Sequence, residues 1–339
     1  MTPSTPCFAL LRAGMALAAS AITLIPASAY SQSATGASPV TWPQRAVRLI
    51  LPFPPGAAAD AFARPIAPKL AESLGQPFIV ENRAGAGGAI GSDFVAKSAP
   101  DGHTLLVTFA THYSLPFFQK AVPYDTLRDF TPVIAAASIH TVLAVHPSHP
   151  ARTMADFLEF ARKSTAPVQY GVGGVGSGPH LAGELLSQAS GVKLAYVPYK
   201  GGGPMMTDLL GGQIPVGLTV LSSAIPHSKS GRLRVLALMA DKRATSALDI
   251  PAITETVASY TLPDIWVGVL APAALPMPIA MRVHGEVSKA INMPDIREKL
   301  VGAGFELTGT LPPQALAESV RRSVDAFRRI TSQAGIQPE

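Results

Sequence analysis

From residue 47 onward, short apolar segments alternate with longer stretches that have the composition of helices. This alternation is typical of right-handed βαβ units, in which helices cover a parallel sheet. The chain is therefore predicted to adopt an α/β fold with parallel sheets. The predicted strands are 47–51, 78–80, 104–109, 168–171, 194–198, 215–220 and 233–239, and the predicted helices are 57–73, 89–98, 154–164, 180–190, 204–210, 278–292, 294–301 and 313–334.

Two further apolar segments, 130–145 and 265–270, do not fit the βαβ pattern and are predicted to cross between two domains. A chain of 339 residues is long enough for two domains. We predict a discontinuous first domain (43–137 and 266–339), a second domain inserted into it (138–265), and a hinge between them. Ligands of such sheets bind at the carboxyl ends of strands.

The N-terminal segment has the features of an export signal. Arg12 precedes an apolar run at 13–25, and small residues at 27–29 suit cleavage near Ala29. A membrane anchor is the alternative, but the apolar run falls short of the roughly 20 residues that span a bilayer. Residues 30–42, rich in Ser, Ala and Thr, are predicted to be a disordered lead-in to an exported, periplasmic protein.

Composition excludes several classes of function. The only cysteine, Cys7, lies in the predicted signal, so the exported protein would have no disulfide, thiol nucleophile or cysteine metal site. The net charge of +5 is small for a protein that binds nucleic acid, so it does not indicate such a partner. We interpret the one basic cluster as a solvated helix face; it comprises Arg321, Arg322, Arg328 and Arg329.

The stretch 49–60, LILPFPPGAAAD, predicts a buried strand, a proline turn and the start of a helix. Gly56 permits close approach of a ligand, and the first N–H groups of the helix would attract an anion. The presence of Asp60 in the first turn has two open explanations. The helix dipole favours an acidic side chain there, or the carboxylate contacts a ligand through water or through an amine of the ligand.

A second glycine-rich turn, 171–176, follows a predicted strand and satisfies G-x-G-x-x-G. A nicotinamide site also needs an acidic residue about 20 positions further on. Here the next strand is followed by Tyr199 and Lys200, so no cofactor is expected. We interpret 171–176 as an anion-binding loop to which Ser177 could add a hydroxyl.

The sequence disfavours two alternative chemistries. Ser177 could be a hydrolase nucleophile with His180 as its base, but Val175 and Pro179 replace the glycines of the nucleophile elbow. A metal site is also disfavoured, because no acidic residue or cysteine stands near His146 and His149, which we assign to a surface turn. No catalytic set is evident, and the protein is not expected to be an enzyme.

Other polar residues complete the predicted binding cleft. Thr108 and Thr111, at the end of the third strand, can offer hydroxyl and N–H groups. Lys200, before three glycines, is a candidate cationic contact to a carboxylate.

Several ordered motifs make the chain resemble the Bug family of periplasmic solute-binding proteins, the receptors of tripartite tricarboxylate transporters. The resemblance extends from about Trp42 to Ile336. Its motifs are FPPG at 53–56 with Asp60, LGQP at 74–77, VENR at 80–83, GAGG at 85–88, APDG at 99–102, VPYKG at 197–201, TDLLGGQ at 207–213, IWVG at 265–268 and LAP at 270–272.

The resemblance implies a type II-like Venus-flytrap fold, in which two α/β domains close around a small organic acid. The acid is bound and is not chemically converted. It implies that two loops hold a carboxylate by main-chain and water contacts. From these loops we predict the ligand contacts Phe53, Gly56, Ala57, Ala58, Asp60, Gly173, Gly174, Ser177 and His180, in addition to Thr108, Thr111, Lys200 and Thr219.

The sequence departs from the family at three places. Ala57 to Ala59 follow Gly56 where the family usually has a second glycine and a hydroxyl-bearing pair before the Asp. Gly178 and Pro179 replace a serine-rich turn, and Thr219 stands where many members carry an acid. Without that acid, an ammonium group would lack a partner. We therefore predict an amine-free dicarboxylate or aromatic acid as ligand.

The predicted function is that of a monomeric periplasmic receptor that delivers a small carboxylate to the membrane permease subunits of a tripartite tricarboxylate transporter. No metal, cofactor or nucleic acid is expected. The alternatives are a ligand-loaded signalling partner of a sensor kinase and, less favoured, a secreted serine hydrolase.

Overall fold

The computed structural model describes residues 41–263, 265–307, 309–333 and 338. Contacts divide the chain into residues 1–39 and 40–339, and the fold described here belongs to the second unit. The predicted signal segment and nearly all of the predicted lead-in lie outside the described residues. Trp42 is an exception to the predicted disorder, because its ring is buried and packs 6.4 Å from Phe78.

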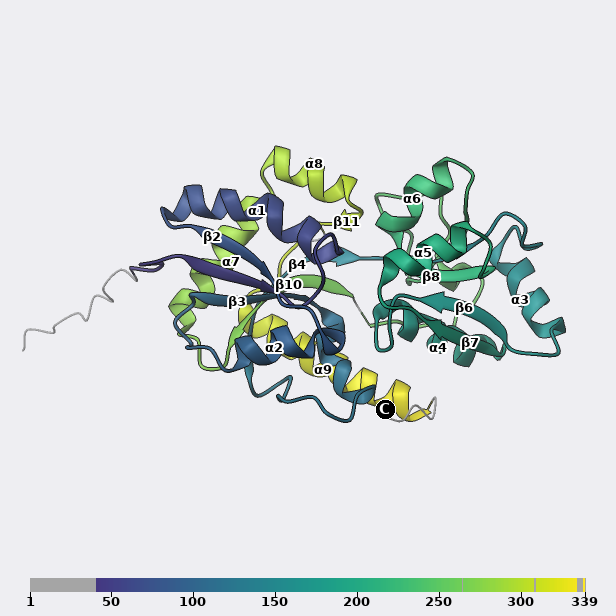
Figure 1. The fold of residues 1–339 in the computed structure, drawn as a ribbon, viewed down its shortest axis with the longest axis horizontal. Coiled ribbons are helices and arrows are strands. Elements are labelled where there is room, and N and C mark those ends of the chain that lie inside the picture. Colours follow the sequence, from purple (N-terminus) through teal and green to yellow (C-terminus); the bar gives the residue numbers. More distant parts are fainter. Residues whose placement is uncertain (1–40, 264, 308, 334–337, 339) are drawn as a thin grey trace, which may run out of the picture. The chain divides into compact units, whose positions relative to one another are not determined.

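The strands form two separate sheets, one of six strands and one of five, each covered by helices (Figure 1). The first sheet has the order β11-β4-β10-β3-β1-β2 and the second β7-β6-β8-β5-β9. We call each sheet with its helices a domain. The strands are β1 Val47–Leu51, β2 Phe78–Asn82, β3 Thr104–Phe109, β4 Phe130–Ile139, β5 Thr141–Val145, β6 Val168–Val172, β7 Leu194–Pro198, β8 Val216–Val220, β9 Arg234–Leu238, β10 Trp266–Pro272 and β11 Phe305–Glu306.

The helices follow the predicted positions closely, with one addition. They are α1 Ala58–Leu74, α2 Ala89–Ala96, α3 Met154–Lys163, α4 Gly178–Ser190, α5 Gly202–Leu210, α6 Leu221–Lys229, α7 Met277–Ile291, α8 Pro294–Gly302 and α9 Pro313–Gln333, with short 3₁₀ turns at Ala86–Gly88, Ala110–Tyr113, Leu115–Phe117 and Ile253–Glu255. Helix α6 was missed, because its serines and the internal Pro226 are typical of a loop.

Both sheets are mixed, so the prediction of parallel sheets is wrong in part. Strands β1 to β3 pair in parallel, as do β6 to β8, but β10 is antiparallel to β3 and β4, and β5 is antiparallel to β8 and β9. The chain reaches both β5 and β10 directly from the other sheet, and the short strand β11 is also antiparallel to β4. Only His140 separates β4 from β5, so no helical crossover fixes a parallel direction there.

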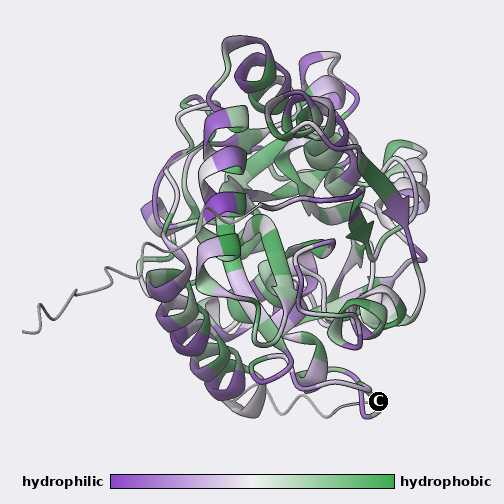
Figure 2. Ribbon diagram, turned by 90° about the vertical axis from the view of Figure 1, so that its left-hand side faces the viewer, coloured by the Kyte–Doolittle hydropathy of each residue, from purple (hydrophilic) through white to green (hydrophobic). Residues whose placement is uncertain are grey.

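Apolar residues fill the space between each sheet and its helices, and Figure 2 shows the apolar strands inside and more hydrophilic outer helix faces. Helix α1 buries Phe62, Ile66 and Leu70, whose spacing of four places them on one face. Helix α9 packs on β4. None of the described helices combines the length and apolar character that crossing a membrane requires.

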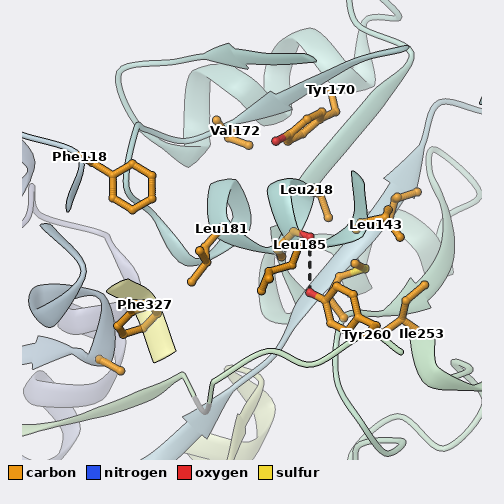
Figure 3. Packing of buried hydrophobic residues seen from close by; sticks show 14 of the residues in the cluster. Phe118, Leu143, Tyr170, Val172, Leu181, Leu185, Leu218, Ile253, Tyr260 and Phe327 are labelled. Carbon is orange, nitrogen blue, oxygen red and sulfur yellow. Dashed lines mark hydrogen bonds between the residues drawn. The ribbon is translucent and has the colours of Figure 1, made fainter. Parts of the chain in front are cut away.

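The largest buried cluster contains residues of both domains. Figure 3 shows Leu181 and Leu185 of α4 near Phe327 of α9, with a hydrogen bond from the Tyr260 hydroxyl to Ala182 O (3.4 Å). Glu306 of β11 also links the domains, because it accepts hydrogen bonds from Thr245 N (3.1 Å) and Thr245 Oγ1 (2.6 Å).

Candidate functional site

The turn between β1 and α1 is held by Asp60. Its carboxylate accepts a hydrogen bond from Gly56 N and another from Asn82 Nδ2 (3.1 Å), and Asn82 Nδ2 also donates to Phe53 O (3.1 Å). Asp60 is 5% exposed and forms an ion pair with Arg64 (3.1 Å). Both Asp60 oxygens are thus engaged within the protein, and the residue organises the turn.

The first N–H group of α1, that of Ala58, is available to a ligand. Ala57 caps the helix with extended backbone and supplies no side-chain hydrogen bond. Ala58 N and Ala59 N have no hydrogen-bond partner among the described residues. A Cβ built on Gly56 would meet nothing within 4 Å. Ala58 is half-buried, so its free N–H can be reached at the N-terminus of α1, where the helix dipole favours an anion, whereas Ala59 is fully buried.

The second glycine-rich loop joins β6 to α4 and is fixed by its own residues. Gly176 N donates to His180 Nδ1 (3.0 Å), the Ser177 hydroxyl donates to Gly174 O (2.7 Å), and His180 N donates to Ser177 Oγ (3.3 Å). Ser177 is therefore the N-cap of α4. Within the described residues, the N–H groups of Gly174 and Val175 have no partner.

His180 is a structural group and is not the base of a hydrolase. It is 2% exposed, and burial lowers its pKa to about 4, so the ring is neutral at pH 7. Its Nδ1 accepts the Gly176 N–H, and the Ser177 hydroxyl hydrogen is directed to Gly174 O. A nucleophile would instead donate this hydrogen to the base.

Contacts around the 3₁₀ turn after β3 connect the two loops. The Phe53 and Phe109 rings lie 5.0 Å apart, which joins the first loop to the end of β3. On the other side, the Ser114 hydroxyl donates to Gly176 O (3.3 Å), and a Cβ on Gly178 would lie 3.7 Å from Thr111 Cγ2. The turn after β3 thus borders both loops.

The remaining predicted contacts are more dispersed. Thr108 is buried in β3 opposite Gly268, and Thr219 is buried in β8 opposite Val142. Lys200 is exposed. Its loop adjoins the second glycine-rich loop, since a Cβ on Gly173 would lie 2.9 Å from Gly202 N. Contact of any of these residues with a ligand stays a prediction.

Sequence reasoning missed Asn82 and Phe109, which support the first loop. Asn82 stands in the VENR motif, but its role depends on contacts with residues far along the chain. The assignment of the HPSHP histidines to a surface turn is wrong for His149, which is buried with its ring 4.8 Å from Phe160. The described residues contain no group of three metal-binding side chains.

Residues 62–335 match the model of the tripartite tricarboxylate transporter family receptor. The chain belongs to this family. The receptor is 33% identical to protein BugT of Bordetella pertussis over 286 residues, covering 83% of this chain and 85% of BugT. It is thus a Bug-type solute-binding receptor, and neither its family nor its structural neighbours are enzymes.

Solved structures agree with this assignment. The R. palustris protein with adipate has a TM-score of 0.81 and 33% identity, covering 88% of this chain and 100% of that one. MatC from Rhodopseudomonas palustris with bound malate has a TM-score of 0.75 and 28% identity, covering 85% and 99%. The receptor therefore has the two-domain α/β fold of periplasmic binding proteins, and receptors of this family are periplasmic.

Proposed function

We propose that the receptor binds a small amine-free carboxylate, either a dicarboxylate or an aromatic acid, between the two loops. The observation that carries this proposal is that the half-buried residues Ala58, Gly174 and Val175 have N–H groups without a partner among the described residues. Backbone donors at helix N-termini bind carboxylates without a cationic side chain.

The related structures support the acid class. One was solved with adipate and another with malate, and both ligands are dicarboxylates without an amine. The half-buried Phe53 and Phe109 rings add an apolar wall beside the first loop. This wall suits the carbon chain or ring of the acid.

An amino acid is a poorer fit. Both oxygens of Asp60 are engaged by Gly56, Asn82 and Arg64, so an ammonium group would have to compete with these partners. Thr219, which is buried in β8, has no charge to offer. A desolvated ammonium group without an anionic partner weakens binding.

We further propose that the receptor acts as a monomer in the periplasm, after cleavage near Ala29, and passes its ligand to permease subunits. Closure would be a population shift toward the arrangement in which both loops contact the acid. This role follows from the family of the chain, whose members are transporter receptors.

A thermal-shift screen of the mature chain tests the ligand class. Adipate, malate, benzoate, glutamate and aspartate would be compared at equal concentration and ionic strength. A ligand at about 100 times its dissociation constant adds about 2.7 kcal/mol to the free energy of unfolding. We expect an amine-free acid to give the largest shift. A larger shift with glutamate or aspartate, or no shift with any acid, would contradict the proposal.

A further inference from the structure

A cavity of about 650 Å³ lies away from the two glycine-rich loops. No residue of 53–60 or 173–180 lines it. One wall is the C-terminal half of α4 in the second domain, and another is α9 of the first domain. The segment 259–263, which precedes β10, completes it. Its volume falls in the range of about 300 to 1,000 Å³ that is usual for small-molecule sites.

Helix α9 turns two different faces to its surroundings. The buried face carries Leu316, Val320 and Phe327, which belong to the protein core. A neighbouring face carries Arg322, Ser323 and Arg329 into the cavity. Arg329 follows Arg322 by seven positions, which places the two residues about two turns and about 10.5 Å apart along one side of the helix.

The two arginines give the cavity a positive charge that the described residues do not neutralise. Arg322 and Arg329 form no ion pair or hydrogen bond with any described residue. Their neighbour Arg328 differs, because it pairs with Asp325 at 2.8 Å. Among the described residues, no acidic side chain lines the cavity. Arg322 and Arg329 are both exposed, as the interpretation of this basic cluster as a solvated helix face expects, and they also line the cavity.

Apart from the arginines, the lining contains apolar side chains and hydroxyl groups. Leu185 and Leu262 lie on the walls, and Ile330 on α9 extends the apolar surface. Figure 3 shows Leu185 on α4 within the cluster that also contains Phe327 of α9. Ser259 and Ser323 add hydroxyl groups. This arrangement suits a molecule with a charged group at each end and an apolar middle.

We propose that this cavity is a second anion site, which binds a linear dicarboxylate of adipate length or longer. One carboxylate pairs with the Arg322 guanidinium and the other with Arg329, while the methylene chain lies along Leu185 and Leu262. Guanidinium groups bind carboxylates with two parallel hydrogen bonds, which favours this pairing over a single diffuse contact. The site does not depend on the loops of the proposed function.

Arginine side-chain NMR of the mature chain, labelled with ¹⁵N-arginine, tests the site directly. Suberate would be the probe, because its two carboxylates can span the separated arginines. The Nε signals of these arginines are assigned by their loss in Arg322→Gln and Arg329→Gln. We expect both signals to shift with suberate along a saturating curve with one midpoint. In each single variant, the signal of the remaining arginine is followed, and the suberate concentration at its midpoint should rise at least about tenfold.

The matched control is Arg321→Gln, since Arg321 is an exposed neighbour on α9 that does not line the cavity. It should leave the titration unchanged. Ala58→Pro removes a donor of the first loop and should also leave the suberate titration of the two arginine signals unchanged. The proposal for this cavity can therefore fail independently of the proposal for the two loops. Acetate at matched ionic strength should not saturate the shifts. Linear shifts with suberate, an equal response to acetate, or unchanged midpoints in the two cavity variants would overturn the proposal.

Discussion

At the scale of single residues, two histidines are held neutral inside the protein. Burial lowers the pKa of His112 to about 3 and that of His180 to about 4. His112 stacks on Tyr124, with ring centroids 5.3 Å apart, and His180 Nδ1 accepts the N–H of Gly176 in the second loop. Protonation would put a charge into each apolar site.

These histidines predict an acid-sensitive fold. Their folded pKa values lie below the unfolded value of about 6.5, so the unfolded chain binds protons first. The free energy of unfolding should be fully retained above pH 6.5 and fall as the pH drops toward 4. Each histidine contributes a slope of about 1.4 kcal/mol per pH unit in that window. Urea unfolding at several pH values between 7.5 and 4.5 measures this dependence of the free energy of unfolding on pH.

The variant His112→Phe separates this effect from the titration of carboxylates. It removes one titrating ring and leaves the acidic residues in place. Its free energy of unfolding should therefore fall less steeply with decreasing pH than that of the natural chain, whatever its stability at pH 7. Equal slopes for the two proteins would contradict the assignment of a depressed pKa to His112.

At the scale of elements, β10 returns the chain to the first sheet and pairs with β3 and β4. Its register against β4 shifts at Val267/Gly268. A Cβ built on Gly268 would lie 2.0 Å from Ile134 O, a backbone atom that cannot move without breaking the ladder. The glycine of the IWVG motif thus permits close strand pairing.

Gly268→Ala should therefore destabilise the protein by about 3 kcal/mol or more. The matched control is Gly285→Ala in α7, where a Cβ would meet nothing within 4 Å. That substitution should raise stability by about 0.5–1 kcal/mol, because alanine favours the helix. Urea unfolding measures both changes. A Gly268→Ala variant as stable as the natural chain would show that the strands pair differently.

The elements that could be predicted from sequence are those with local signals. Strand β1 is an apolar run that ends at prolines, and α1 ends at Gly75, whose φ of 69° places it in the left-handed region. Strand direction has no local signal, so the antiparallel placement of β5 and β10 was missed. The support of the first loop by Asn82 was missed for the same reason, since Asp60 and Phe53 are distant in sequence.

At the scale of the whole molecule, the two domains share few polar links, and one of them is Glu306. Burial raises its pKa, but hydrogen bonds from Thr245 and His140 outweigh this and hold the pKa below its usual value. A ligand held by loops of both domains would add a further link between them. Its binding energy is then sensitive to each donor, even though the donors lie in different domains.

The most direct test of the account is calorimetric titration of Ala58→Pro with the acid that gives the largest thermal shift. Proline is tolerated at the first position of a helix, and Ala57, at φ −71° and ψ 167°, already has the backbone that precedes a proline. The substitution therefore removes one N–H without disturbing α1. Ala58→Ser keeps that N–H and is the control. We predict that Ala58→Pro raises the dissociation constant about tenfold or more, while Ala58→Ser leaves it nearly unchanged. Equal affinity in both variants would contradict the claim that free amide groups of the first loop hold the carboxylate.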